Sequence, residues 1–183
     1  MSRILRANDR DWQPWANGGG VSATLFESPE GGAPRVRIAL ATIDRDGPFS
    51  DYSGFERTLL HAGGPPLVLV VDGVRHFLGR GDQIVFDGAS PVEAVDVRGP
   101  VSALNLMARP GTTGTIVVRD GTDLDLDLDS GAGAGTTLAL LLSGAPTVAG
   151  QPLAPLDAVL LDLGARVRFA GRATVAVVHA LPG

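Results

Sequence analysis

The chain has 183 residues and a formal net charge of −5, and it contains neither cysteine nor lysine. A chain of this length can bury a core without a disulfide or a structural metal. The missing residue types exclude thiolate nucleophiles, thiolate zinc sites, Schiff-base lysines and phosphate-loop lysines, and no basic block indicates nucleic-acid binding.

The N-terminal segment bears on where the protein works. Residues 1–9 carry charged side chains before the apolar core of a signal peptide could form. No apolar run approaches the length of roughly 20 residues that a membrane helix needs. We therefore expect a cytoplasmic protein that binds neither a membrane nor nucleic acid.

Short apolar runs bounded by glycine, proline, aspartate or asparagine dominate the rest of the chain. Runs of this length, separated by turn residues, predict an all-β sandwich or barrel. The best helix signal is a single turn near residues 53–57, which is too short to carry the fold. Examples of the expected strands are residues 36–43, 66–72, 82–86, 101–107, 115–119, 137–142, 158–161 and 174–179.

An internal echo indicates two similar halves. In each half, an apolar run ending in glycine precedes an aspartate that leads into a second apolar run, and a third apolar strand closes the pattern. This order is typical of the middle of a cupin jelly roll, where a hairpin returns the chain across the barrel. Chance similarity between segments rich in valine and leucine is the alternative. The matched segments are residues 67–73, 79–88 and 101–107 in one half and residues 138–144, 155–164 and 174–179 in the other.

The echo predicts a bicupin, with two cupin-like barrels in one chain. We expect residues 1–110 to form the first barrel, which holds the candidate pocket, and residues 111–183 to form a second, degenerate barrel. The join lies within residues 109–136, where aspartate alternates with leucine over residues 123–129. An exposed edge strand protected by its charge is the favoured interpretation of this segment, and a calcium site is the alternative.

Histidine spacing argues against a metal centre. A metal-binding cupin usually gathers a His-x-His pair, a glutamate and a third histidine around its ion. This chain has only His61, His76 and His179, and no two of them lie within two residues of each other. The sequence therefore predicts no metal and no cofactor. It also lacks the Gly-x-Ser-x-Gly elbow that presents a serine nucleophile.

Two arginines are candidates for binding an anion. Strand alternation places Arg37 on the same face as Ala39 and Ala41, where small residues leave room inside a barrel. A solvated face, with Arg37 outside the barrel, is the alternative. Arg57 follows a turn at the start of another apolar run and raises the same question. Two convergent guanidiniums would hold a carboxylate in a bidentate manner.

Two asparagines extend the candidate site. Asn105 lies between Leu104 and Leu106 in an expected strand, where asparagine is disfavoured unless it bonds to a loop or a ligand. Asn17 opens a glycine-rich segment, which either faces a ligand with its backbone amides or forms a tight turn.

These residues belong to an ordered set of short motifs: Trp15-Ala16-Asn17-Gly18-Gly19-Gly20, Arg37-Ile38-Ala39, Gly47-Pro48-Phe49-Ser50, Gly54-Phe55-Glu56-Arg57 and Asn105-Leu106-Met107. The set resembles the HutD/Ves family of bacterial bicupin proteins, which are associated with histidine-utilisation genes. The resemblance spans residues 12–107 and fades to a general pattern in the second half. It implies a bicupin fold without the metal ligands of enzymatic cupins, and small carboxylates such as urocanate, formylglutamate or formate as ligands. The family usually has an acidic and an aromatic residue before Asn-Leu-Met, where this chain has Ala103 and Leu104.

The sequence thus predicts a protein that binds a small anionic metabolite, a carboxylate, and serves amino-acid (histidine) catabolism as an accessory or regulatory protein. An enzyme is one alternative, a hydrolase or isomerase with His61 or His76 as the general base. A scaffold that works through protein partners is another, and a homodimer is a further expectation. The expected ligand-binding residues are Arg37, Phe49, Ser50, Arg57, Asn105 and Asn17.

Overall fold

The structure, a computed structural model, describes residues 2–15, 18–28, 34–127, 135–162 and 165–181. These residues are mostly in β-strands, with one short 3-10 helix, η1 (Ala7–Asp9), so the prediction of an all-β chain is confirmed. The expected helical turn near residues 53–57 was wrong, because a turn at residues 53–54 leads directly into strand β6 (Glu56–Gly63). No helix among the described residues has the length and apolar character needed to cross a membrane.

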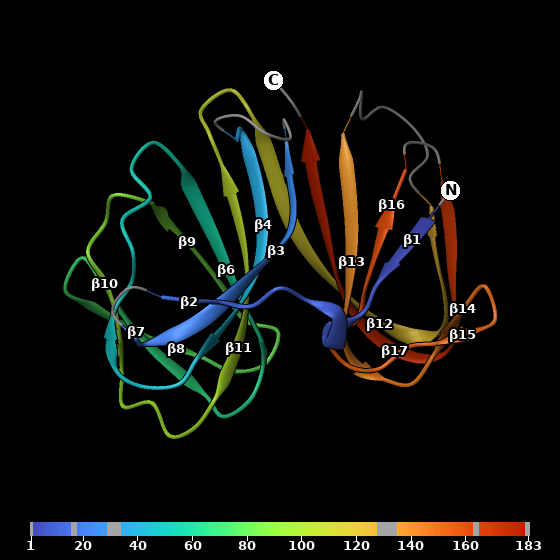
Figure 1. The fold of residues 1–183 in the computed structure, drawn as a ribbon, viewed down its shortest axis with the longest axis horizontal. Coiled ribbons are helices and arrows are strands. Elements are labelled where there is room, and N and C mark those ends of the chain that lie inside the picture. Colours follow the sequence, from blue (N-terminus) through green and yellow to red (C-terminus); the bar gives the residue numbers. More distant parts are fainter. Residues whose placement is uncertain (1, 16–17, 29–33, 128–134, 163–164, 182–183) are drawn as a thin grey trace. The chain divides into compact units, whose positions relative to one another are not determined.

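The chain divides into two compact units (Figure 1). Residues 11–112 form one, here called the central unit, and residues 1–10 and 113–183 form the other, called the terminal unit. The expected range of the first barrel, residues 1–110, therefore includes an N-terminal segment that the structure groups with residues 113–183.

The central unit contains two antiparallel sheets. The six-stranded sheet has the order β2 (Gln13–Pro14), β3 (Gly20–Ser28), β4 (Val36–Ile43), β11 (Val101–Ala108), β6, β9 (Gln83–Asp87). The four-stranded sheet has the order β5 (Gly47–Pro48), β10 (Val92–Val95), β7 (Leu67–Val71), β8 (Val74–Leu78).

The core of the central unit lies between these two sheets. On β7, Leu67, Leu69 and Val71 are buried while the alternate residues Val68 and Val70 are partly exposed, as expected for a sheet with one face on a core. The same cluster takes in residues from both sheets: Ile43, Leu59, Leu78, Phe86, Val92, Ala94, Val101 and Ala103. Trp15 and Phe49 pack against this cluster, and both also line a pocket.

The terminal unit is built around one seven-stranded sheet. Its order is β1 (Ser2–Leu5), β16 (Ala158–Leu161), β13 (Thr136–Gly144), β17 (Arg166–Leu181), β14 (Thr147–Val148), β15 (Gln151–Pro152), and β12 (Thr113–Asp127) also pairs with β17.

Asp157 anchors the N-terminal segment to this sheet. Its carboxylate accepts hydrogen bonds from Nη1 of Arg6 at 2.9 Å and from the backbone N–H of Ala7 at 2.7 Å. Burial alone would raise the pKa of Asp157, but the bonds from Ala7, Ala154 and Arg6 outweigh it and lower that pKa. The first strand, β1, is therefore held in register with β16 by a buried carboxylate.

Both units contain the same two turns. The turns between β7 and β8 and between β14 and β15 each place two residues at positive φ, namely Asp72-Gly73 (50° and 81°) and Ala149-Gly150 (49° and 76°). Asp82 and Asp157 each accept a hydrogen bond from the backbone N–H three residues upstream, at 2.8 and 3.1 Å. The expected correspondence between these aspartate turns is therefore present in the structure.

One matched pair of segments in the echo was wrong. Strand β6 pairs with β9 and β11, and β13 pairs with β16 and β17, so β13 corresponds to β6 rather than to β7. A glycine follows or ends each strand, Gly64 (φ +98°) and Gly144 (φ +101°), where a Cβ would lie 2.4 or 2.2 Å from a backbone oxygen. Sequence comparison missed the correspondence because Arg57 and His61 interrupt β6, whereas residues 138–142 of β13 are continuously apolar and looked more similar to the purely apolar β7.

The acidic segment forms the end of β12. Leu124 and Leu126 pack against the core of the terminal unit, while Asp123 and Asp125 are exposed and lie 3.4 and 3.6 Å from the guanidinium of Arg168. In the described part of the chain, no group of three or more His, Asp or Glu side chains is placed to hold a metal ion. These contacts support the solvated strand over the calcium site; Asp129 lies outside the described residues.

Candidate ligand-binding site

The two candidate arginines lie on one rung of the six-stranded sheet. Met107 on β11 has Arg37 on β4 and Arg57 on β6 as its Cα partners, so the arginines flank the central strand. Residues directly opposite each other in an antiparallel sheet point to the same face. Two strand spacings correspond to about 10 Å, a span that two arginine side chains can bridge from both sides.

Small residues on the next rungs leave space beside the arginines. Asn105 on β11 lies opposite Ala39, and Ser22 on β3 lies opposite Ala41. All four side chains line the same pocket as Arg37. The expectation that Arg37 shares its face with Ala39 and Ala41, inside the barrel, is thus met by the structure.

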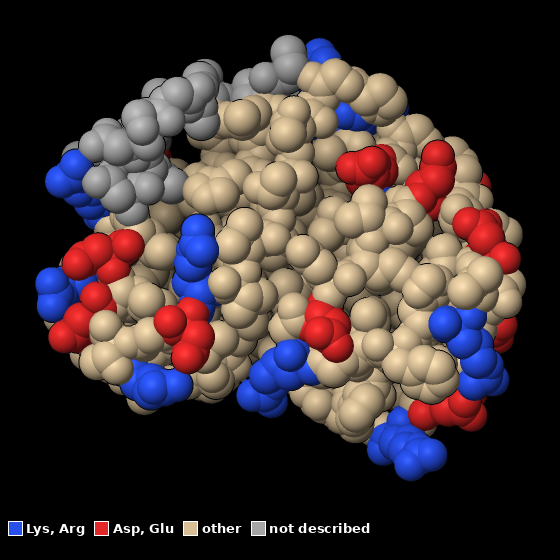
Figure 2. Space-filling model, turned by 180° about the vertical axis from the view of Figure 1, so that it is seen from behind, with Lys and Arg blue, Asp and Glu red and all other residues tan. Residues whose placement is uncertain are grey.

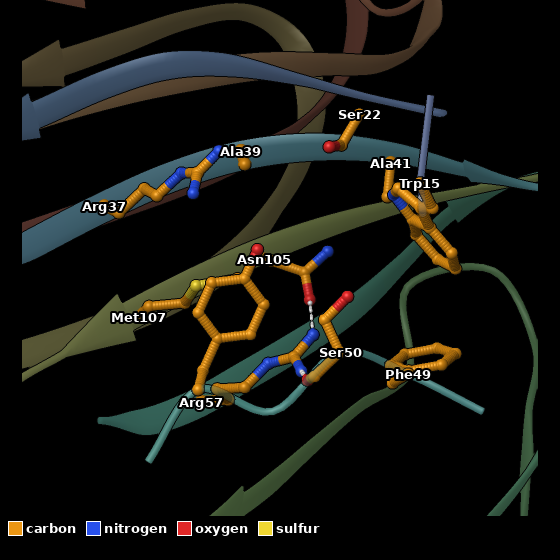
Figure 3. A pocket seen from close by; sticks show the side chains of 11 residues that line it. Trp15, Ser22, Arg37, Ala39, Ala41, Phe49, Ser50, Arg57, Asn105 and Met107 are labelled. Atoms are coloured by element: carbon orange, nitrogen blue, oxygen red, sulfur yellow. Dashed lines mark hydrogen bonds between the residues drawn. The ribbon is translucent and has the colours of Figure 1, made fainter. Parts of the chain in front are cut away.

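Arg57 is the most constrained charged group in this pocket. Its side chain is almost fully buried, and Nη2 donates to Oδ1 of Asn105 at 3.0 Å (Figure 3). Nη1 lies 3.4 Å from the carbonyl oxygen of Ser50. Three aromatic rings, those of Phe49, Tyr52 and Phe86, lie with their centroids 5.5, 5.0 and 5.1 Å from the guanidinium carbon. These contacts fix the direction in which Arg57 points.

The charge of Arg57 has no anionic partner among the described residues. Burial lowers its pKa to about 10, with Tyr52 acting in the opposite direction, so the side chain stays a cation at neutral pH. Its Nε–H is buried and forms no hydrogen bond. A buried cation without a counter-ion is costly unless an anion or other acceptor enters the site.

Arg37 has spare donors as well. Its Nη2 donates to Oγ1 of Thr24 at 3.0 Å, and its Nε–H is buried without a hydrogen bond. The described carboxylates form no ion pair with it. The pocket therefore presents two arginines whose donors are only partly satisfied by protein groups.

Aromatic side chains close one side of the pocket. The rings of Trp15 and Phe49 meet edge to face, with centroids 5.5 Å apart, and stand together at one side of the view in Figure 3. The cavity volume, taken as the space open to the centre of a water molecule, is about 30 Å³. One water needs about 10–15 Å³ on this measure, so the pocket has room for a ligand of a few heavy atoms.

The structure brings together five of the six expected ligand-binding residues. Arg37, Phe49, Ser50, Arg57 and Asn105 line one pocket, whereas Asn17 lies outside the described residues. Their role in binding stays a prediction.

The site contains further residues that sequence reasoning did not assign to it: Trp15, Ser22, Tyr52 and Met107. Trp15 and Met107 stood within the recognised motifs, and Met107 shares the strand face of Asn105. Ser22 and Tyr52 belonged to no recognised motif. Ser22 reaches the pocket through the register of β3 against β4, and Tyr52 reaches it through the loop that precedes β6. Ala103, at the family's usual acidic position, lies in the apolar core cluster and not among the lining residues.

The histidines lie elsewhere. His61 is fully buried, with Nε2 2.7 Å from the carbonyl oxygen of Pro65, and His76 is on β8. His179, in the terminal unit, has Nδ1 2.9 Å from Oγ1 of Thr137. No histidine is among the described residues that line the pocket. The general-base alternative therefore has no histidine base at this site in the described part of the chain.

Charge on the surface is mixed in sign. On the face shown in Figure 2, arginines and acidic residues are interspersed, and no continuous basic area is visible.

Comparisons with known proteins find relatives of this chain both in sequence and in structure. The family model described as HutD matches residues 7–178. A 21.2 kDa protein encoded in the hutC 3′ region of Pseudomonas putida is 31% identical over 112 residues, which are 59% of this chain and 58% of that protein. This chain thus matches less than two thirds of the length of that relative.

Solved structures show the same fold. HutD from Pseudomonas fluorescens SBW25, in a formate condition, has a TM-score of 0.80 at 24% identity, covering 97% of this chain and 98% of that chain. A conserved protein of unknown function from Pseudomonas aeruginosa PAO1 has a TM-score of 0.80 at 26% identity, covering 98% of each chain. A cupin 2 conserved barrel domain protein from Leptotrichia buccalis has a TM-score of 0.63 at 14% identity, covering 99% and 96%. The fold is therefore cupin-like.

Proposed function

Because the chain belongs to the HutD family, we propose that its central-unit pocket binds a small carboxylate and that the protein serves histidine catabolism as an accessory or regulatory protein. The link to histidine utilisation is shown at the level of the family and of the hutC-region relative. The ligand and the role of each pocket residue are the proposal.

The observation that carries this proposal is the state of Arg57. A cation that is almost fully buried, directed by Asn105 and surrounded by three aromatic rings has no anion beside it among the described residues. A ligand carboxylate would supply the missing negative charge and accept a hydrogen bond from the unsatisfied Nε–H of Arg57. Charge-assisted hydrogen bonds of this kind are stronger than those between neutral groups. An arginine needed only for stability would be expected to face a carboxylate of the protein itself.

The rest of the pocket supports an anionic ligand of small size. Arg37 adds a second cationic donor on the same rung, Ser22 and Ser50 add polar groups, and Ala39 and Ala41 leave the free volume. A volume of about 30 Å³ suits the carboxylate head of a metabolite or a free acid such as formate or acetate. The Pseudomonas fluorescens HutD structure was obtained in a formate condition, which makes formate a reasonable first probe.

Titration of the full chain with sodium formate and sodium acetate, against sodium chloride at the same ionic strength, tests the proposal. Trp15 lies in the pocket, so tryptophan fluorescence and calorimetry can both report occupancy. We expect Arg57→Ala to weaken binding by about 10- to 150-fold, the usual worth of one charge-assisted hydrogen bond of 1.5–3 kcal/mol. Arg57→Lys should restore little of the loss, because an ammonium lacks the planar fork.

Arg98→Ala is the matched control, since Arg98 is exposed and does not line the pocket. Carboxylate affinity that stays the same in Arg57→Ala, or that falls equally in Arg98→Ala, would show that the pocket has been placed wrongly.

A further inference from the structure

Strand β8 is an exposed edge of the four-stranded sheet. Among the described strands it pairs with β7 alone. Its residues Val74 and Phe77 are 58% and 73% exposed, the two highest values among the large apolar side chains of the described chain. Val68, which lies opposite Phe77 on β7, is also partly exposed and extends the apolar surface. Exposed apolar edges are the sites where sheets pair with another chain.

The register shows which backbone groups on this edge are free. A two-residue turn, Asp72-Gly73, joins β7 to β8 and makes Val71 and Val74 a hydrogen-bonded pair. Bonded and non-bonded pairs alternate along an antiparallel ladder, so His76 and Leu78 also bond to β7. The N–H and C=O groups of Arg75 and Phe77 consequently point away from the sheet. No described loop bonds to them.

The edge lacks the features that usually prevent pairing. Proteins protect free edges with lysine, proline, bulges or inward-pointing charge. Strand β8 reads Val-Arg-His-Phe-Leu, and its pairing with β7 runs without a register shift. Arg75 is the single charged residue of the strand, and its Nη1 is bound to Asp96 at 3.0 Å. The edge is thus free to accept a further strand.

We propose that β8 pairs with β8 of a second copy of this chain, antiparallel and around a two-fold axis at His76. This register opposes all five residues of β8, and it places Arg75 opposite Phe77 of the second copy on both sides of the axis. The outward N–H and C=O groups of Arg75 and Phe77 then face each other, which is the bonded pair that an antiparallel ladder requires.

The side chains of β8 indicate both which partner strand pairs with it and in which register. With the axis at His76, each Arg75 opposes an aromatic residue, with which it can form a cation–π contact if it turns from Asp96, and no like charges are opposed. An axis at Arg75 would oppose two arginines directly. An axis at Phe77 would leave Val74 and Arg75 beyond the end of the partner strand. The pattern is therefore complementary to itself, and a second copy is the partner that it fits.

A charge exchange at position 77 tests the register. Phe77→Lys places lysine opposite Arg75 twice in each dimer, whereas Phe77→Glu places glutamate there. Sedimentation velocity over a concentration series should show a dimer for the unsubstituted chain, association weakened by about tenfold or more in Phe77→Lys, and stronger association in Phe77→Glu than in Phe77→Lys. Val85→Lys, at a similarly exposed valine on β9, should behave as the unsubstituted chain.

The absence of cysteine permits a direct geometric test. His76 lies at the non-bonded position on the axis, where opposite Cα atoms are about 4.5 Å apart, within the range of a disulfide. His76→Cys should therefore give a disulfide-linked dimer under mild oxidation, while Val118→Cys, on β12, should not. A monomer at all concentrations, a dimer equally stable in Phe77→Lys and Phe77→Glu, or no cross-linking through Cys at 76 would overturn the proposal.

Discussion

Replacing Arg57 by an apolar residue should show separately how the buried cation affects the stability of the protein and how it contributes to ligand binding. In Arg57→Met a flexible apolar chain takes the place of the guanidinium among Phe49, Tyr52 and Phe86, with sulfur–aromatic contacts in place of cation–π contacts. If Arg57 is retained for a ligand, the ligand-free protein should lose no stability on this change. Carboxylate binding should be lost.

The expected magnitude follows from the pKa. A pKa of about 10 for Arg57 lies roughly 2–3 units below that of an exposed arginine, so the charged form costs about 3 kcal/mol in the pocket. Its removal recovers that free energy but leaves Oδ1 of Asn105 without its donor, at a cost of about 1–3 kcal/mol. Arg57→Met should therefore change the free energy of unfolding by between about 0 and +2 kcal/mol. The double change Arg57→Met/Asn105→Leu, which removes the unpaired oxygen as well, should raise it by about 1–3 kcal/mol.

The assay is urea unfolding of the ligand-free chain at pH 7.5, with Arg98→Met as the exposed control. A double variant that is less stable than the original chain by more than about 1 kcal/mol would refute the reasoning. Arg57 would then be a structural support whose aromatic contacts outweigh its desolvation, and its unpaired charge would no longer argue for a ligand.

Three further outcomes are expected. Elemental analysis of the purified protein should find no stoichiometric iron, zinc or manganese; about one ion per chain, lost on changing His76, would contradict this. Asp123→Asn and Asp125→Asn should each alter the free energy of unfolding by no more than about 0.5 kcal/mol, because exposed ion pairs contribute little, and calcium should not raise the melting temperature. Asp157→Asn should destabilise the protein by about 1–3 kcal/mol at pH 7. Because the folded-state pKa of Asp157 is lowered, its stabilisation is present above the ordinary carboxyl pKa, and the difference in urea midpoint should shrink as pH falls from about 5 to 3.

Strands in which apolar residues predominate could be predicted from the sequence more readily than strands with several polar residues. The expected runs 36–43 and 158–161 coincide with β4 and β16. Strand β8 was not among the strands predicted by range, because arginine and histidine interrupt its apolar pattern. Such strands form because their neighbours supply backbone partners, which local composition does not encode.

The site was predictable where strand alternation decides orientation. The face of Arg37 follows from its spacing to Ala39, a property of the strand alone. The bond between Arg57 and Asn105 joins residues 48 positions apart and depends on the register of β6 against β11. Sequence reasoning named both residues but could not place one against the other, because several registers keep the same faces inward.

The pairing of β1 with β16 has a consequence for the order in which the protein is made. Arg3 and Leu160 are register partners, so a long stretch of chain, which includes the central unit, is synthesised between them. The central unit, residues 11–112, is continuous and has all its strands once residue 112 has left the ribosome, and domains generally fold as units from the N-terminus. Strand β1 must therefore wait, unpaired, until β16 has been synthesised. An N-terminal fusion tag that delays or blocks this late docking should lower the yield of folded terminal unit while leaving the pocket intact.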